Sequence, residues 1–305
     1  MNNKSVTLKA SEETLSSVKK DYAQYASPFK GEYIIFKALK NGLIITAYEN
    51  KKGEFFKIIF SGNHALEEAR KYDVSATYNI PKKVVAEKWL DEGPQIGSDE
   101  VGVGDLLLPM IVVSAYVSKD DVIELKRLGI HDSKKMSDET ILKIGPLLCQ
   151  KFAFSKLTLP NAKMSDEVLK GENLNTLKAK MHNRALLNLK KKFPIVKNIY
   201  IDQFVSENTY YKYLKNEKEI LSDLVFKTKG ESSFPSIALA SVIARYAFLL
   251  EKEKLEKKYG VKFPYGANKI VDEFSTHLIA KIGFKEFSKL AKRNFKNYQE
   301  LSKKQ

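Results

Sequence analysis

Ile96-Gly-Ser-Asp-Glu-Val-Gly-Val-Gly-Asp-Leu-Leu-Leu-Pro-Met-Ile-Val-Val-Ser-Ala-Tyr-Val117 is the stretch that decides the fold. Two adjacent acids, Asp99 and Glu100, follow the expected start of a strand, and the glycines Gly102 and Gly104 precede a β-branched run. Two carboxylates in the middle of a sheet are costly to bury unless a metal ion or a paired cation compensates them. The stretch therefore predicts a catalytic strand and its turn; the alternative is a solvated turn that carries two acids.

The two acids pose a geometric problem. Successive side chains of a regular strand face opposite sides, so Asp99 and Glu100 cannot both point at one ion unless the strand is distorted. Gly97, Gly102 and Gly104 would allow a kink or a bulge there.

Composition narrows the possible functions. The 305 residues suffice for about two domains. A net charge of +15, from 52 basic and 37 acidic residues, favours a polyanionic partner such as nucleic acid, although a lysine-rich composition also arises in AT-rich genomes. One cysteine and four histidines exclude a zinc-finger or other Cys/His cluster. A metal ion would therefore be held by oxygen atoms, which favours magnesium or manganese.

The same composition bears on location. Cys149 has no second cysteine to pair with, which favours a reducing, cytoplasmic setting. The N-terminal residues lack the apolar run of a signal peptide, and no stretch approaches the roughly 18 apolar residues of a membrane span. We expect a cytoplasmic protein that is neither exported nor inserted in a membrane.

Hydrophobic patterning divides the chain into two domains. The first, residues 1–80, is expected to be a small α+β unit of helix, three strands and helix. Its predicted elements lie at residues 11–25, 33–39, 43–48, 55–60 and 65–72, with a hairpin turn at Asn41-Gly42. A linker is expected at residues 81–94, followed by a second domain at residues 95–305.

Strand and helix patterns alternate in the second domain, which predicts an α/β fold with a mixed sheet covered by helices. We expect residues 96–98 and 109–117 to pair as a hairpin, and Ser137 and Ser165 to cap helices. A long helix is predicted at 173–192, a strand at 198–202, and a helix that opens at Pro235 and ends at Gly260.

Two further acids end or precede neighbouring elements. Asp202 closes the strand at 198–202, and Glu231 comes shortly before Pro235. Phosphodiester hydrolysis needs an activated water and relief of charge on the leaving oxygen, and two divalent ions about 3.5 to 4 Å apart supply both. Three or four carboxylates can hold such a pair, which makes Asp99, Glu100, Asp202 and Glu231 the candidate metal ligands.

Three motifs resemble those of the type 2 ribonucleases H. They are Gly97–Asp105, Asp132–Ser137 and Ala240–Arg245. The helix segment Asn173–Asn183 resembles more narrowly the bacterial ribonuclease HIII subfamily, and the N-terminal extension is similar to its TATA-binding-protein-like domain. The resemblance covers nearly the whole chain, with its parts in the right order.

The resemblance implies a ribonuclease H-like catalytic domain preceded by a TATA-binding-protein-like substrate-binding domain. It also implies an endonuclease that hydrolyses the RNA strand of RNA/DNA hybrids and leaves 5′-phosphate and 3′-hydroxyl ends. The family's four acids fall on Asp99, Glu100, Asp202 and Glu231, which would bind Mg²⁺ or Mn²⁺ as catalytic ions. Glu231 supports the HIII subfamily, because ribonucleases HII have Asp there. Gly102-Val103-Gly104 stands where HII enzymes have Gly-Arg-Gly and HIII enzymes commonly Gly-Thr-Gly.

Other residues are candidates for substrate contact. The backbone N–H groups of the turn at Gly102, Val103 and Gly104 would approach a sugar or phosphate closely. We expect phosphate contacts from Lys134, Lys135, Ser241 and Arg245; the alternatives are a solvated turn at the lysines and close packing around Ala238, Ala240 and Ala244. His182 and Asn183 could contact substrate or make structural bonds. We expect Asp105 and Asp132 to be structural and Asp272 to lie near the site.

The N-terminal domain combines aromatic residues with lysines. Its sheet carries Tyr33, Phe36, Tyr48, Phe55 and Phe56, flanked by Lys37, Lys40, Lys51, Lys52 and Lys57. Such a sheet can lay an exposed face on a duplex, although most of these rings should belong to the core. We expect the partner to be an RNA/DNA hybrid and the protein to be a monomer without an obligate protein partner. The alternatives are excision of single embedded ribonucleotides and a non-catalytic nucleic-acid-binding protein.

Overall fold

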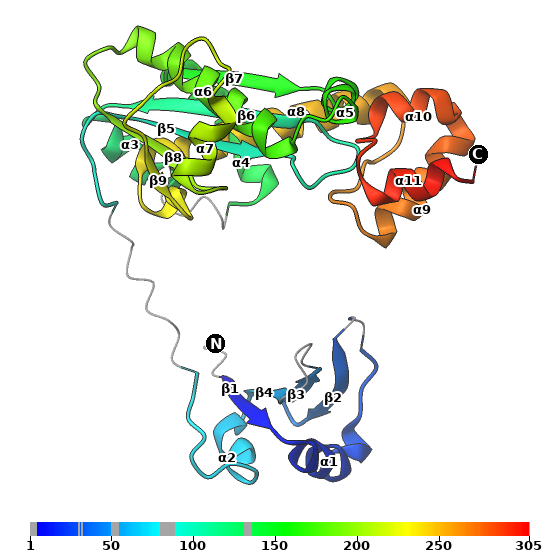
Figure 1. The fold of residues 1–305 in the computed structure, drawn as a ribbon. Helices are drawn as coiled ribbons and strands as arrows, with labels where there is room; N and C mark the ends of the chain where they lie inside the picture. Colours follow the sequence, from blue (N-terminus) through cyan, green and yellow to red (C-terminus); the bar gives the residue numbers. More distant parts are fainter. Residues whose placement is uncertain are drawn as a thin grey trace. The chain divides into compact units, whose positions relative to one another are not determined.

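The computed structural model describes residues 5–29, 31, 33–49, 55–79, 89–130 and 136–304. The chain forms two compact units, Met1–Val85 and Ala86–Gln305 (Figure 1). Much of the predicted linker at 81–94 falls on residues 80–88, which lie outside the described residues.

The N-terminal unit is a four-stranded antiparallel sheet with the strand order β1-β4-β3-β2. The predicted Asn41-Gly42 hairpin is confirmed, and both residues have the positive φ (48° and 82°) that a tight two-residue turn requires. The elements are β1 (Ser5–Ala10), α1 (Glu12–Asp21), η1 (Ala23–Tyr25), β2 (Ile34–Lys40), β3 (Leu43–Tyr48), β4 (Phe56–Gly62) and α2 (Ala65–Arg70).

The prediction of three strands was incomplete, because Ser5–Ala10 forms a fourth. Val6, Leu8 and Ala10 alternate with polar residues and point into the core, the two-residue period of a strand buried on one face. Leu15 and Val18 of α1 pack in the same core, so helices cover one face of this sheet.

The second unit is built on a five-stranded mixed sheet with the order β7-β6-β5-β8-β9. The first three strands of that order are antiparallel, and β5, β8 and β9 run parallel. The elements are β5 (Gln95–Val101), β6 (Met110–Val117), α3 (Asp121–Arg127), α4 (Asp138–Lys151), β7 (Phe154–Leu159), α5 (Asn161–Leu169), α6 (Leu174–Lys192), β8 (Asn198–Asp202), α7 (Glu207–Leu214), β9 (Val225–Lys227), η3 (Gly230–Ser232), α8 (Pro235–Tyr259), α9 (Lys269–Ile282), α10 (Phe284–Leu290) and α11 (Lys296–Ser302). The predicted α/β class, a mixed sheet flanked by helices, is confirmed.

Helices α8 and α6 cover opposite faces of this sheet. Val113 and Ala115 of β6 pack with α8, whereas Ile96 of β5 and Ile201 of β8 pack with α6. Gly97 allows the start of α8 to approach β5, since a Cβ there would lie 2.4 Å from Ser236 Oγ. The pairing of β5 with β6 is regular from Gln95 to Val101, so this strand lacks the distortion that we expected.

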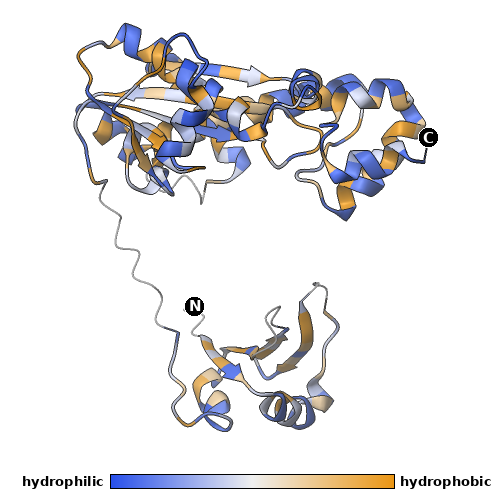
Figure 2. Cartoon of the chain, viewed as in Figure 1, coloured by the Kyte–Doolittle hydropathy of each residue, from blue (hydrophilic) through white to orange (hydrophobic). Residues whose placement is uncertain are grey.

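The three C-terminal helices form a separate apolar cluster. Leu106 and Leu107, which follow the glycine turn, are buried in it with Phe287 and Ala291. Figure 2 shows hydrophobic and hydrophilic segments alternating along these helices, as expected where one side of each is buried. Leu106 and Leu107, shortly after β5, therefore belong to the core of the C-terminal helices.

One capping prediction was wrong. Ser137 caps α4, and its side chain accepts a hydrogen bond from the Thr140 N–H, but Ser165 lies inside α5 rather than at its start. That helix begins at Asn161 after Pro160, and Ser165 is buried, accepting from the backbone of Arg293. Among the described helices, none combines the length and the apolar character that a membrane crossing needs.

Candidate active site

Asp99 lies on β5, the central strand of the sheet, on the face that α8 covers. It is 8% exposed, and Ser241 of α8 and the Glu100 N–H donate hydrogen bonds to its carboxylate. Burial raises the pKa of Asp99, and the nearby carboxylates of Glu100 and Asp202 raise it further. The mutual repulsion of these acids is one that a bound cation would relieve.

Asp202 is brought to Asp99 by the parallel pairing of β5 and β8. The register pairs Ser98 with Ile201, so the next residues, Asp99 and Asp202, follow on the same face of neighbouring strands. The Gly230 N–H donates to Asp202 Oδ1 at 2.8 Å, which places η3 and its buried residue Glu231 beside the end of β8. Asp99 and Asp202 thus lie together on the α8 side of the sheet, and Glu231 follows Gly230, whose backbone contacts Asp202.

Glu100 faces α6 instead. Lys178 Nζ contacts its Oε1, and His182 Nε2 lies 3.0 Å from its Oε2. Although burial acts to raise it, His182 and Lys178 together lower the pKa of Glu100 to about 2. Glu100 is therefore ionised and held by two side chains that lie one turn apart on α6.

The donor set suits a hard divalent cation, because all four side chains offer carboxylate oxygens. Within the ranges that the structure describes, however, no three Asp, Glu, His or Cys side chains are grouped as a ready metal-binding cluster. The regular β5 strand explains this, since it points Asp99 and Glu100 to opposite faces.

His182 and Asn183 make structural bonds, which is one of the two alternatives that the sequence left open. His182 is buried, with Nδ1 2.5 Å from Ser98 Oγ and its ring stacked on Phe204. Asn183 donates to the carbonyl oxygen of Glu219 and accepts from the N–H of Leu221. Lys178 was not singled out from the sequence. Its position four residues before His182 places both side chains on one face of the helix and was a usable signal.

Ser241 and Arg245 line a depression beside the acids. Its volume is about 300 Å³, and its walls are Glu100, Val101, Met136, Asp138, Ile141, Ser241, Val242 and Arg245. The Arg245 guanidinium donates to both oxygens of Asp138, at 2.9 and 3.0 Å, and lies 4.7 Å from the centre of the Tyr265 ring. The Arg245 side chain is thus hydrogen-bonded to Asp138 in the first turn of α4. Asp132, Lys134 and Lys135 lie outside the described residues.

The glycine turn connects β5 to the C-terminal helices. Gly102 has a φ of +84°, and a Cβ there would lie 2.1 Å from Pro109 O, so only glycine fits. Val103 packs against the cluster that contains Met110 and Met164, whereas Gly104 is exposed, with no heavy atom within 4 Å of a Cβ position. The side chain of Val103 therefore packs inward, and the exposed tip of the turn is the backbone of Gly104.

Asp105 and Asp272 have structural partners. Asp105 Oδ1 accepts from the Gly266 N–H at 2.6 Å, in keeping with its predicted role. Asp272 accepts from Asn297 Nδ2 at 2.6 Å. The first hydrogen bond joins the glycine turn to the loop before α9, and the second joins α9 to α11.

The aromatic residues of the N-terminal sheet divide between core and surface. Phe36 and Phe56 pack against the core, while Tyr33 and Phe55 are 38% and 52% exposed. Leu39 and Ile44, on the hairpin strands β2 and β3, are also exposed. We expected most of these rings to belong to the core, but of the five, all of which the structure describes, only Phe36 and Phe56 pack against it.

The comparisons agree with this architecture. Residues 96–298 match the family model described as ribonuclease HII, and residues 5–83 match a domain of unknown function, DUF3378. The first match defines the class of the larger domain as a type 2 ribonuclease H.

The relatives that match nearly the whole chain are more specific. Ribonuclease HIII of Bacillus cereus (strain ATCC 10987 / NRS 248) is 36% identical over 304 residues and 96% of each chain. Ribonuclease HIII of Listeria monocytogenes serotype 4b (strain CLIP80459) is 34% identical over 299 residues and 95% of each chain. The chain belongs to the ribonuclease HIII family and is a ribonuclease H enzyme.

Solved structures show the same relationship. Bst-RNase HIII in complex with Mn²⁺ is 30% identical, with a TM-score of 0.67 over 99% of this chain and 100% of that one. The ribonuclease H2 from Pyrococcus horikoshii OT3 has a TM-score of 0.59 at 20% identity, over 69% of this chain and 98% of its own. The second likeness concerns the fold alone.

Proposed function

We propose that the protein is a metal-dependent endonuclease that hydrolyses the RNA strand of RNA/DNA hybrids to give 5′-phosphate and 3′-hydroxyl ends. The observation that carries this proposal is the buried carboxylate of Asp99 with those of Glu100 and Asp202 close enough to raise its pKa. A buried carboxylate with two further carboxylates close by serves no purpose in a protein that only binds a polyanion, because these charges repel phosphates.

Asp99, Glu100, Asp202 and Glu231 would hold two Mg²⁺ or Mn²⁺ ions. When bound, such ions supply an activated water and stabilise the charge on the leaving 3′-oxygen. The Mn²⁺ complex of the related Bst-RNase HIII supports a divalent ion in this site. The protein's own contribution is positioning: Ser241 donates to Asp99, the Gly230 N–H donates to Asp202, and Lys178 keeps Glu100 ionised.

Hybrid recognition is assigned to the glycine turn and the basic residues around the site. The exposed backbone at Gly104 and the N–H of Val103 would read the 2′-hydroxyl groups of the RNA strand, the feature that separates RNA from DNA. Lys134 and Lys135 remain the proposed phosphate contacts. Ser241 and Arg245, in the wall of the depression, complete the proposed substrate-binding set.

The N-terminal unit would add affinity that does not depend on sequence. Its exposed Tyr33, Leu39, Ile44 and Phe55 combine apolar surface with the lysines of the same sheet. With binding assigned to one unit and catalysis to the other, no second protein is required, and we propose that the enzyme works as a monomer.

The Asp99→Asn variant tests the proposed function. It keeps the size of the side chain but removes the charge, so cleavage of a hybrid in Mg²⁺ or Mn²⁺ should fall at least about 100-fold. Asp120→Asn, at the exposed start of α3, is the matched control and should retain full activity. Unchanged cleavage by Asp99→Asn would refute the mechanism.

The choice of substrate separates the proposal from its rival. A duplex with a stretch of four ribonucleotides should be cleaved, and a duplex with one embedded ribonucleotide should be a poor substrate. Efficient cleavage of the second duplex would instead indicate excision of single ribonucleotides.

A further inference from the structure

Lys292 is a fully buried lysine in the segment between α10 and α11. Its side chain is 0% exposed, and its Nζ donates to the carbonyl oxygens of Gly102 and Asp105, the latter at 2.5 Å. Its backbone N–H donates to Leu106 O at 2.9 Å. An ammonium group is costly to bury unless it is hydrogen-bonded, and here both ends of the glycine turn supply acceptors.

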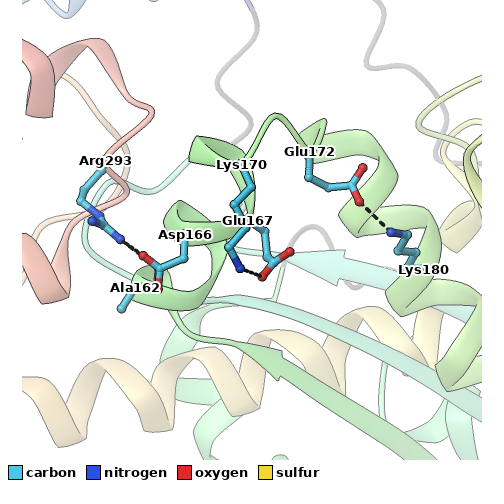
Figure 3. A network of polar contacts seen from close by, with 7 residues as sticks. All are labelled: Ala162, Asp166, Glu167, Lys170, Glu172, Lys180 and Arg293. Atoms are coloured by element: carbon cyan, nitrogen blue, oxygen red, sulfur yellow. Dashed lines mark hydrogen bonds and ion pairs between the residues drawn. The ribbon is translucent and has the colours of Figure 1, made fainter.

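The segment that carries Lys292 is fixed to α5. The Arg293 N–H donates to the buried Ser165 Oγ at 2.9 Å, and its guanidinium contacts Asp166 and the carbonyl oxygen of Ala162 (Figure 3). Asn161 Nδ2 donates to Leu290 O at 2.6 Å, just before the same segment. Lys292 therefore reaches the turn from a backbone that is held on both sides.

The contact fixes the direction of one peptide group. The C=O of Gly102 and the N–H of Val103 belong to the same planar trans peptide and point in opposite directions. Because the Gly102 oxygen points to the buried Lys292 Nζ, the Val103 N–H points away from it. The next residue, Gly104, is exposed with open space at its Cβ position, so the turn presents backbone on the accessible side.

We propose that Lys292 is a positioning residue for hybrid recognition, which orients the Gly102–Val103 peptide so that the Val103 N–H is presented to the substrate. The inference rests on the proposed function, in which this turn reads the RNA strand. A lysine suits the task because two carbonyl oxygens converge on one point, and a single ammonium group can donate to both. An apolar residue would leave both oxygens without this donor, and the Gly102 oxygen would keep only the long hydrogen bond from the Asp105 N–H, at 3.4 Å.

The test compares Lys292→Met with the wild type in the full-length protein. Loss of one oriented hydrogen bond to the substrate should raise the KM for an RNA/DNA hybrid about tenfold, with a smaller change in kcat. Inhibition by a DNA duplex, which has no 2′-hydroxyl groups, should stay within about twofold. The Val103 amide resonance, followed by ¹⁵N–¹H NMR, should shift in the free variant.

Lys289→Met is the matched control. Lys289 lies three residues earlier, its side chain is 63% exposed, and it pairs with Glu286 rather than with the turn. It should leave the KM and the Val103 resonance unchanged. If Lys292→Met does not fold, Lys292→Gln replaces it, since its uncharged and shorter side chain can reach at most one carbonyl oxygen.

The outcomes are distinct. A merely structural role would lower the melting temperature of the folded variant but leave its KM for the hybrid unchanged, and that result would overturn the inference. If the wild type itself fails to cleave the hybrid, the proposed function fails and the inference falls with it. A raised hybrid KM together with unchanged inhibition by DNA supports the inference.

Discussion

The Nε2 atom of His182 lies 3.0 Å from Oε2 of Glu100, while Nδ1 of the same ring lies 2.5 Å from Ser98 Oγ. Ser98 and Glu100 alternate along β5 and face the same helix, α6, so one buried imidazole bridges two residues of one strand. Lys178, one turn earlier on α6, contacts the other carboxylate oxygen. Glu100 is thereby held by both of its oxygens before any substrate arrives.

Loss of Lys178 should destabilise the protein. Lys178→Met removes one partner of a buried carboxylate, so the free energy of unfolding in urea, without added metal, should fall by about 3 kcal/mol. The double variant Lys178→Met/Glu100→Gln should recover part of this loss, because the charge left without its lysine is also removed. If the free-energy losses of the two single variants simply add in the double variant, Lys178 and Glu100 are not coupled.

Lys180→Met provides the control for that experiment. Lys180 lies on the same helix but pairs with Glu172 at 2.7 Å in a much more exposed position (Figure 3). Ion pairs of this kind contribute little, so the free energy of unfolding should change by no more than about 1 kcal/mol.

The two glycines of the turn should respond differently to the same methyl group. Gly102→Ala forces a side chain into the positive φ region and against Pro109 O, and should cost more than about 2 kcal/mol of stability. Gly104→Ala meets open space and should change stability by less than about 1 kcal/mol. Thermal unfolding measures both, and equal losses would show that the turn is not held as described.

Hybrid cleavage by Gly104→Ala gives a further measurement. If the exposed tip meets the RNA strand, a methyl group there should raise the KM for the hybrid while the fold stays intact. An unchanged KM would place the RNA strand away from this tip.

Much of the fold follows from local patterns. The hairpin at Asn41-Gly42, the strand at 198–202 and the helix from Pro235 to Gly260 are predictable because turn residues, caps and periodicity all agree. The strand at Ser5–Ala10 was missed because its short alternation lies before a helix, with no hairpin turn to mark it. Ser165 misled the prediction because a serine followed by two acids has the appearance of a cap, whereas tertiary contact with Arg293 decides its place.

The candidate site was predictable in its acids but not in its supports. Asp99 stands within a predicted buried strand, Asp202 ends another and Glu231 precedes a helix, and carboxylates are seldom buried without a partner. Lys292 gives no such signal, because nothing in the sequence marks one of the 52 basic residues as buried, and Lys178 is marked only by its spacing from His182. Their partners lie at distant positions in the chain, and only the packing of α6 and of the C-terminal helices brings them together.

Removal of the N-terminal unit should affect binding more than chemistry. A variant that starts near residue 86 keeps the larger unit with its own apolar clusters, and its KM for a hybrid should rise about tenfold at physiological salt while kcat changes less. Affinity should also depend less steeply on salt concentration, because phosphate contacts are lost. Full affinity of the truncated protein at physiological salt would refute a binding role for the unit.

The buried ammonium of Lys292 should give stability an unusual dependence on pH. Burial lowers the pKa of Lys292 from the ordinary 10.5 to about 8, although the carboxylate of Asp105 acts in the opposite direction. Between these two values the folded protein binds fewer protons at this site than the unfolded chain, so its contribution to the free energy of unfolding rises with pH. Other lysines and tyrosines titrate in the same range, and Lys292→Met cancels their effect when the two proteins are compared. The stability of the wild type relative to this variant should increase between about pH 7.5 and pH 10.5, by on the order of 3 kcal/mol. A difference that stays constant over this range, measured by urea unfolding, would show that Lys292 keeps an ordinary pKa in the folded protein, and a difference that falls would show that its pKa is raised.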